Sequence, residues 1–136
     1  MKKFHFAAAA LAASAFAVAG AAHAEDTLKK IKDSGSITEG VRESSGALAF
    51  TLGDGKYAGF HYDVCARIIA DIQKQLGMAK VDIKYQPVTS QNRIPLVQNG
   101  TVDIECGSTT NNATRQKDVA FAPTLYVEEE IGRAHV

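Results

Sequence analysis

The chain has 136 residues, with 15 basic and 15 acidic side chains, so its formal net charge is zero. No run of basic residues is present, which argues against a nucleic-acid-binding protein. The sequence contains two cysteines and no tryptophan, and its length suits one small domain. These values favour a single folded unit that has no nucleic-acid partner.

Both ends of the chain differ from the part between them. Lys2 and Lys3 precede an Ala-rich apolar run, and residues 22–24 (A-H-A) fit the small-x-small pattern of a cleavage site. We expect residues 1–24 to be a secretory signal peptide, because the alternative, a membrane anchor, needs about 20 strongly apolar residues. Residues 131–136 continue no earlier pattern and match one reading frame of a common sequencing adapter, so we expect a non-native tail.

Residues 25–130 then form the folded part of the chain. The two tails carry three basic residues and no acidic one, so the part between them is slightly acidic. An exported protein enters an oxidising compartment, where cysteines form disulfides. Cys65 can pair with Cys106, or Cys106 can pair with a cysteine outside the given sequence, and the spacing leaves both alternatives open.

The first part of this region is predicted to contain a helix, a strand and a hairpin. Thr27 is expected to cap a short helix with Leu28 and Ile31 inward. Residues 36–41 form the first predicted strand. Residues 47–61 are expected to fold as a hairpin-like excursion around a glycine-rich turn.

The strongest helical pattern follows the hairpin. Asp63 is expected to be the N-cap of this helix, and Gly77 is expected to end it. Its apolar stripe recurs at helical spacing and consists of Val64, Ile68, Ile72 and Leu76. Cys65 lies beside this stripe rather than on it.

Two further strands come next. Residues 81–86 alternate between apolar and polar side chains, as expected for a strand. Ser90 is expected to cap the helix that follows, and residues 101–106 form the third predicted strand. We interpret Asp103 and Glu105 on that strand as solvated or structural residues.

A short helix from Thr114 and another strand from Leu125 complete the predicted elements. The order strand–helix–strand–helix–strand predicts an α/β fold with a parallel sheet and right-handed crossovers. In such sheets, ligands bind outside the carboxyl ends of the strands. Each of the three loops there supplies one arginine, namely Arg42, Arg93 and Arg115.

The third of these loops offers the most donors to a ligand. It spans residues 106–117 and carries several hydroxyl side chains, among them Ser108 and Thr110, before Arg115. A helix starting at Thr114 would add its free backbone N–H groups to these donors. Such a set binds an anion, most simply a carboxylate. The alternative is a polar loop with a solvated arginine.

Three guanidinium groups in one cleft repel one another, so a ligand with two carboxylates would suit them best. One carboxylate would be held by Ser108, Thr110 and Arg115. The other would be held by Arg42, Ser90 and Arg93. A neutral amino acid would leave one arginine cluster unpaired, and we expect it to be rejected.

The sequence offers little for catalysis. His61 is the one histidine within residues 25–130, and we interpret it as a surface or packing residue. No His–carboxylate–hydroxyl set, phosphate-binding loop or metal-ligand spacing stands out. We therefore expect no enzymatic activity, no cofactor and no metal.

Three segments carry a resemblance to a known family. V-R-E-S-S (41–45), T-S-Q-N-R-I-P-L-V-Q-N-G-T (89–101) and E-C-G-S-T-T-N-N-A-T-R-Q-K (105–117) resemble the periplasmic amino-acid-binding proteins of ABC transporters, above all the glutamate/aspartate-binding proteins of Gram-negative bacteria. The resemblance covers residues 27–128. It implies a class II periplasmic binding fold of two lobes, of which residues 25–130 are an incomplete first lobe with a mostly parallel sheet flanked by helices.

The resemblance also implies a role for each site residue. Ser108, Thr110 and Arg115 would hold the α-carboxylate of an amino acid. Arg42, Ser90 and Arg93 would hold the side-chain carboxylate. The implied ligand is L-glutamate or L-aspartate, the partner is an inner-membrane ABC permease, and the protein is a periplasmic monomer. The alternatives are a periplasmic dehydratase-type enzyme on the same fold and the ligand-binding sensor domain of a receptor.

Overall fold

The computed structural model describes residues 23–127 of the chain. In chain order, the elements are α1 (His23–Ser34), β1 (Ser36–Val41), the 3-10 turn η1 (Gly46–Leu48), β2 (Phe50–Gly53), β3 (Lys56–Ala58), α2 (Phe60–Gln75), β4 (Asp82–Pro87), α3 (Arg93–Gln98), β5 (Ile104–Glu105) and the 3-10 turn η2 (Arg115–Lys117). The predicted tail and the first 22 residues of the predicted signal peptide lie outside the described part. Within that part, no helix is long and apolar enough to cross a membrane.

β1 is the central strand of a parallel sheet with the order β4-β1-β5. It pairs with β4 along its whole length and with β5 at Glu39 and Gly40. The predicted parallel α/β order is therefore confirmed, although β5 is shorter than the predicted strand 101–106. Because all three strands run the same way, the loops after them meet at one edge of the sheet.

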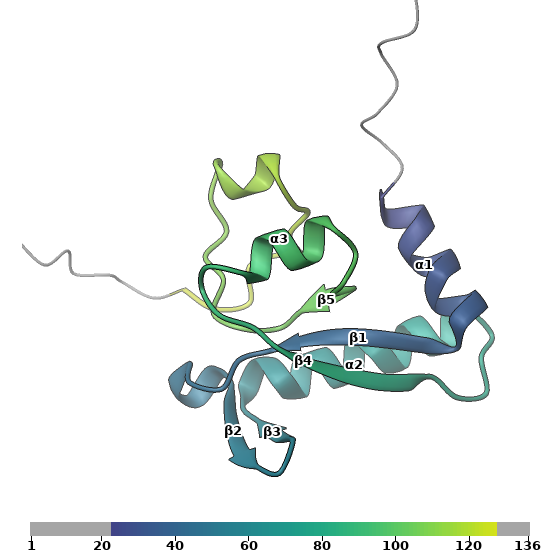
Figure 1. Cartoon of the computed structure of the whole chain (residues 1–136), viewed down its shortest axis with the longest axis horizontal. Coiled ribbons are helices and arrows are strands. Elements are labelled where there is room, and N and C mark those ends of the chain that lie inside the picture. The colour runs from purple at the N-terminus through teal and green to yellow at the C-terminus, as the bar shows by residue number, and fades with distance from the viewer. Residues whose placement is uncertain (1–22, 128–136) are drawn as a thin grey trace, which may run out of the picture.

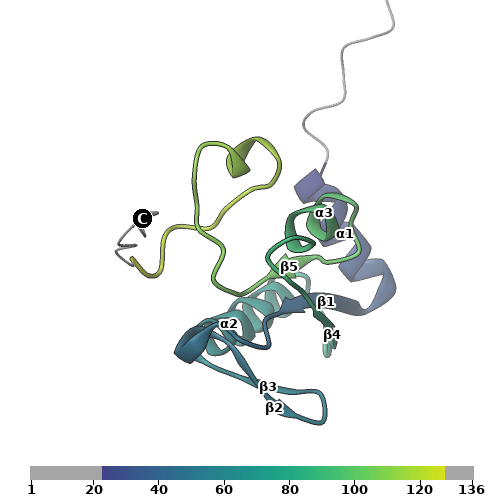
Figure 2. The same ribbon diagram turned by 60° about the vertical axis from the view of Figure 1, so that its left-hand side comes forward.

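The sheet lies between α2 on one side and α3 on the other (Figures 1 and 2). The core on the α2 side consists of Ile31, Ile37, Cys65, Ile69 and Val81. On the other face, a side chain at Gly40 would come within 3.0 Å of Val102. Glycine in the middle of β1 therefore allows the segment before β5 to pack closely on the sheet.

The predicted inward position of Leu28 is wrong, and the predicted stripe of α2 is confirmed only in part. Leu28 is 38% exposed, and among residues 27–34 of α1 only Ile31 is buried. On α2, Ile72 and Leu76 of the predicted stripe pack against the core, but the fully buried residues are Cys65 and Ile69, one position after Val64 and Ile68. The reason is covalent, because a disulfide between Cys65 and Cys106 draws that side of the helix onto the sheet.

This disulfide resolves the two alternatives left by the sequence. It joins α2 to the residue that directly follows β5, over a sequence separation of 41 residues. Closing a loop of this length reduces the entropy of the unfolded chain and is worth about 4 kcal/mol in the chain-entropy model. The bond therefore ties the longest helix to the carboxyl edge of the sheet.

The helices begin at residues other than the predicted caps. α1 already includes His23, before Thr27, and α2 starts at Phe60 with Gly59 as its N-cap instead of Asp63. Gly59 has a φ of 126°, and a Cβ there would lie 2.6 Å from the carbonyl oxygen of Leu48. Glycine thus permits a close approach that no other residue allows.

The predicted cap of α3 is also wrong. Asn92 precedes the first helical residue, and Thr89 and Asn92 close the turn by donating their backbone N–H groups to each other's side chains. Ser90 is an exposed residue within this turn. The turn therefore supplies its own hydrogen bonds and leaves Ser90 free of a capping role.

The C-terminal elements are weaker than predicted. The helix expected from Thr114 is the single 3-10 turn η2, and residues 120–127 contain no regular element. The strand expected from Leu125 therefore does not form in the described residues. β4 and β5 occupy both sides of β1, and no strand of the described residues pairs with the outer side of β5.

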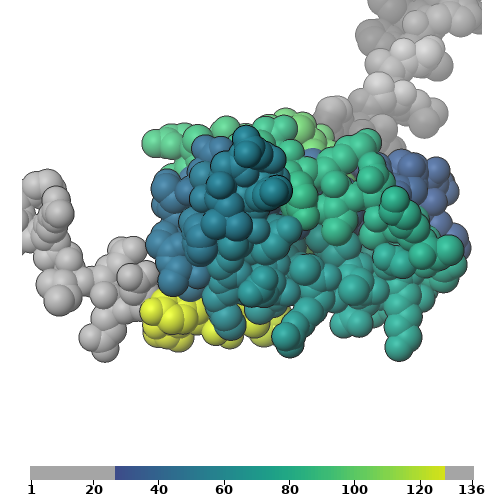
Figure 3. Space-filling view, turned by 90° about the horizontal axis from the view of Figure 1, so that it is seen from below, coloured from purple at the N-terminus to yellow at the C-terminus, as the bar shows by residue number. Residues whose placement is uncertain are grey.

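The predicted hairpin is confirmed. β2 and β3 pair antiparallel, with Phe50 opposite Ala58 and a turn in which Gly53, Asp54 and Gly55 have positive φ. Seen from below, the hairpin and α2 form one face of the molecule (Figure 3). The hairpin thus extends the molecule on the side away from α3.

Glu39 on the central strand is only 1% exposed, and burial raises the pKa of its carboxyl group from 4.5 to about 7. Because the folded pKa is the higher one, the buried carboxylate destabilises the fold increasingly as the pH rises from about 4.5 to 7, and the full penalty remains above that. We predict that Glu39→Gln raises the free energy of unfolding by about 1–3 kcal/mol at pH 8 and changes it little at pH 4.5.

Urea denaturation at both pH values measures this difference. Glu43→Gln is the matched control, because Glu43 is an exposed carboxylate just after the same strand, and it should give no pH-dependent gain. A gain for Glu39→Gln that is equal at both pH values would contradict the prediction.

Candidate ligand-binding site

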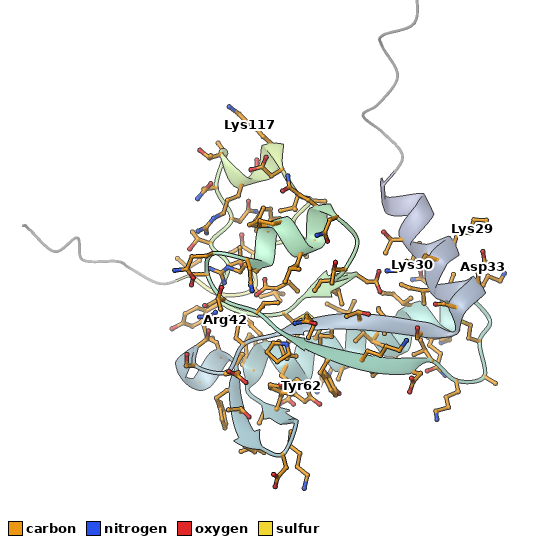
Figure 4. The ribbon with its side chains drawn as sticks, viewed as in Figure 1. Lys29, Lys30, Asp33, Arg42, Tyr62 and Lys117 are labelled. Carbon is orange, nitrogen blue, oxygen red and sulfur yellow. A yellow bond between two sulfur atoms is a disulfide. The ribbon has the colours of Figure 1, made fainter. Side chains whose placement is uncertain are left out.

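The loops after β1, β4 and β5 carry the predicted site residues. Arg42 directly follows β1, where the chain turns away from the sheet (Figure 4). Arg93 is the first residue of α3, which follows β4, and Arg115 begins η2 after β5. Each arginine therefore stands after a different strand of the same sheet, as the sequence predicts.

Arg42 connects two of these loops. Its Nη1 donates to the carbonyl oxygen of Val88 at 2.9 Å, and its Nε donates to Ser45 Oγ at 3.1 Å. Ser45 Oγ in turn lies 3.0 Å from Ser108 Oγ, in the loop after β5. Sequence reasoning missed this role of Ser45, although the residue stands in the V-R-E-S-S segment that carries the family resemblance.

Arg93 is the buried member of the group and is 5% exposed. Among the described residues, its Nε and Nη1 atoms have no hydrogen-bond partner. Nη1 lies 3.7 Å from Oε1 of Glu105, which suits an ion pair but is too long for a hydrogen bond. Arg93 therefore presents buried donors that an anion could satisfy.

The three guanidinium groups are close enough to act on one another. Burial lowers the pKa of Arg93, the charge of Glu105 partly offsets this, and the positive charges of Arg42 and Arg115 lower the pKa further. Such mutual repulsion is expected where like charges gather at one place. The charges of Arg42 and Arg115 thus both act on Arg93, and the three residues are together called the arginine cluster.

The donors around Arg115 differ from those predicted. Its Nη1 donates to the carbonyl oxygen of Thr110 at 3.0 Å, and its backbone N–H donates to Asn112 Oδ1 at 3.0 Å. The backbone N–H expected to be free for an anion is therefore already used. The guanidinium group and the nearby hydroxyl groups remain as the donors of this loop.

An open cavity of about 570 Å³ lies at the edge of β5. Of the six predicted residues, it is lined by Arg93, Ser108 and Thr110. Its wall is largely apolar and includes Val64 and Ile68, which explains why these two residues of the predicted α2 stripe are only half-buried. Arg42, Ser90 and Arg115 stand outside this cavity.

Glu105 lies within the arginine cluster, and its place there was not predicted. Its Oε2 accepts a hydrogen bond from Thr109 at 2.7 Å, and its Oε1 faces Arg93. Asp103, by contrast, is structural as predicted, since it accepts the backbone N–H of Thr38 at 2.8 Å. The alternation of side chains along the third strand could have placed Glu105 on the side of the sheet opposite Cys106.

α2 holds the loop after β5 in two ways. The disulfide fixes Cys106, and Nδ1 of His61 donates to the carbonyl oxygen of Gly107 at 2.7 Å. His61 is therefore a packing residue, as predicted, but the contact is made with the ligand loop itself. These two ties hold the residue before Ser108 in place.

The absence of a side chain at Gly107 is required by its neighbours. A Cβ there would lie 2.3 Å from Glu105 Oε1 and 2.4 Å from Arg42 Cγ. We predict that Gly107→Ala displaces both side chains and lowers the free energy of unfolding by about 1–3 kcal/mol, as overpacking usually does. Urea denaturation measures the loss, and an unchanged midpoint would show that the loop tolerates the methyl group.

A mostly parallel sheet flanked by helices is part of the architecture of the class II periplasmic binding proteins. The family model described as bacterial extracellular solute-binding proteins, family 3, matches residues 37–132, and the chain belongs to this family. The predicted family and fold are therefore confirmed.

Two characterised relatives are similar over most of the chain. It is 47% identical over 116 residues to the glutamate/aspartate import solute-binding protein of Salmonella typhimurium, which covers 80% of this chain and 38% of that protein. It is 49% identical over 102 residues to the L-glutamate/L-aspartate-binding protein of Pseudomonas aeruginosa, which covers 74% of this chain and 33% of that protein. The chain thus spans about a third of the length of each relative.

The chain is also similar to the solved structure of a protein that is an ancestor of an enzyme. The crystal structure of an ancestral amino acid-binding protein, a precursor of cyclohexadienyl dehydratase, matches with a TM-score of 0.56 and 28% identity. The match covers 67% of this chain and 37% of that one. The same fold therefore occurs in a binding protein and in the ancestry of an enzyme.

Proposed function

We propose that the protein carrying this chain binds L-glutamate and L-aspartate in the periplasm and delivers them to an inner-membrane ABC permease. In this proposal, residues 1–24 are a signal peptide that is removed on export, and residues 25–130 belong to the first lobe. The arginine cluster carries the proposal, above all the buried Arg93 with its unpartnered donors. The names of the two relatives support the choice of ligand.

The cluster suits a small dicarboxylate on electrostatic grounds. Burying guanidinium donors without partners costs free energy, and a carboxylate that accepts their hydrogen bonds removes this penalty. Each charge-assisted bond contributes roughly 1.5–3 kcal/mol. After the entropy of capture, a handful of such bonds reaches about −8 kcal/mol, which corresponds to a micromolar Kd.

In this proposal, each of the two carboxylates of the ligand is bound by its own set of residues. The α-carboxylate is held by Ser108, Thr110 and Arg115. The side-chain carboxylate is held by Arg42, Ser90 and Arg93. A second lobe closes over the ligand, and the permease recognises the closed form.

Arg115→Ala tests the α-carboxylate site. In the full-length protein, we predict that it weakens L-glutamate binding by about 2–5 kcal/mol, because a carboxylate is left unpaired in a closed cleft. Lys117→Ala is the control, because Lys117 is an exposed cation of the same 3-10 turn and should change binding little. Calorimetry that finds the same Kd for Arg115→Ala and the unsubstituted protein would remove Arg115 from the site.

Arg93→Ala tests whether Arg93 binds the side-chain carboxylate of the ligand. We predict a much larger loss of affinity for L-glutamate than for L-glutamine, whose neutral amide does not need a guanidinium partner. Both affinities are measured by calorimetry, and the urea midpoint checks that the variant is folded. Equal losses for the two ligands would mean that Arg93 does not distinguish them.

A dehydratase-type enzyme on the same fold is the second candidate. The likeness to a dehydratase precursor favours it, and so does Glu105, since such an enzyme needs an acid or base beside the arginines that hold its substrate. Incubating the full-length protein with a prephenate-like dicarboxylate distinguishes the two, because only the enzyme consumes it. A sensor domain would instead require a membrane span elsewhere in the protein.

A further inference from the structure

A buried carboxyl group lies beside the disulfide. One carboxylate oxygen of Glu39 and the two sulfur atoms of Cys65 and Cys106 all lie within 4.8 Å of one another. Glu39 is 1% exposed and Cys65 is 0% exposed. The Oε1 atom of Glu39 has no hydrogen-bond partner among the described residues. The carboxyl group of Glu39 has no role in the proposed binding of an anion, whereas the disulfide only holds the loop before Ser108.

The surroundings of Cys65 make its reduction difficult. Its neighbours in the core are Ile31, Ile37, Ile69 and Val81, which offer no proton and no positive charge. Breaking the disulfide releases one sulfur as a thiolate, and a thiolate in an apolar core is an unpaired buried charge. A proton must therefore reach Cys65 as the bond breaks, and Glu39 is the acidic side chain beside it.

We propose that Glu39 is the internal proton donor and acceptor for thiol–disulfide exchange at Cys65–Cys106, so that it governs how fast a dithiol partner breaks or forms this bond. The role is one of proton transfer to a sulfur atom, and it is independent of the ligand of the arginine cluster.

The exchange proceeds in two balanced steps. A thiolate of the dithiol attacks Sγ of Cys106, the more exposed of the two cysteines, and forms a mixed disulfide while the Cys106–Cys65 bond breaks. The electron pair of that bond leaves on Sγ of Cys65, which takes the proton of the Glu39 carboxyl group. The second thiolate of the dithiol then attacks the reagent's other sulfur, which is bonded to Cys106 in the mixed disulfide. Cys106 leaves as a thiolate, which is protonated by water.

In the oxidising direction, the same steps run in reverse. The Glu39 carboxylate takes the proton from Cys65, and the resulting thiolate attacks the mixed disulfide at Cys106. Burial raises the pKa of Glu39 to about 7, between an ordinary carboxyl group and a thiol, so the proton can move either way near neutral pH.

The titratable groups near Glu39 are few in the described part of the chain. Tyr85 on β4 lies opposite it in the sheet, and the charge of Glu39 contributes to the raised pKa of this tyrosine. Tyr62 on α2 shares a hydrogen bond with Tyr85 at 2.9 Å and is labelled in Figure 4. α1 contributes Ile31 and β5 contributes Ile104, neither of which titrates. His61 on α2 is a further titratable group, and its ring donates to the carbonyl oxygen of Gly107 next to Cys106. The Glu39→Gln variant keeps His61 and therefore separates the two groups.

The test is the rate at which dithiothreitol reduces the disulfide in the full-length protein, followed by alkylation and mass spectrometry from pH 5.5 to 9. Rates are divided by the concentration of the reagent's thiolate. We expect the unsubstituted protein to lose rate as the pH rises through about 7, where Glu39 loses its proton. Glu39→Gln should be at least about tenfold slower below pH 6.5 and should show no such break.

The pH range separates this role from a purely structural one. A merely structural Glu39→Gln variant would resist reduction above pH 7, where it is the more stable protein, and would match the unsubstituted protein below that. Glu39→Asp, which keeps an acid at the position, should retain a break near neutral pH. Overlapping profiles for Glu39→Gln and the unsubstituted protein, or no break in Glu39→Asp, would overturn the proposal. Glu43→Gln should follow the unsubstituted protein throughout.

Discussion

Mutual repulsion between three guanidinium groups is the constraint on which the site depends, because the fold must hold them together without a ligand. Arg42 and Arg115 each donate to a backbone carbonyl oxygen, and Arg93 faces the carboxylate of Glu105. These contacts fix the positions of the charges but do not satisfy them, since two buried donors of Arg93 remain unpartnered. Arg93 therefore keeps buried donors beside the positive charges of Arg42 and Arg115, and this arrangement is what the proposed anion site rests on.

The precision of this arrangement comes from the opposite side of the sheet. α2 fixes the loop after β5 through the disulfide at Cys106 and through the hydrogen bond from His61 to Gly107. These two contacts, at the adjacent residues Cys106 and Gly107, restrict both the position and the orientation of the loop after β5. Ser108, the next residue, is thereby held within reach of Ser45 and of the loop that carries Arg42.

The sequence predicts the order of the elements and the edge of the sheet where the arginines lie, because both follow from periodicity and from the place of loops in parallel sheets. Caps and faces were predicted less well, since they depend on contacts between distant segments. Gly59 starts α2 because Leu48 approaches it, and Cys65 replaces Val64 in the core because Cys106 is its partner. The position of Glu105 beside Arg93 likewise depends on how β5 pairs with β1. The identity of the six ligand residues stays a prediction.

Among the described residues, β5 pairs with β1 alone, and the largely apolar cavity beside it is walled in part by residues 119–127. β5 is two residues long, and so short an edge strand offers few free backbone groups to another chain. The larger exposed feature at this edge is therefore the apolar wall of the cavity and not the strand. A segment that covered it would gain more from buried apolar surface than from backbone pairing.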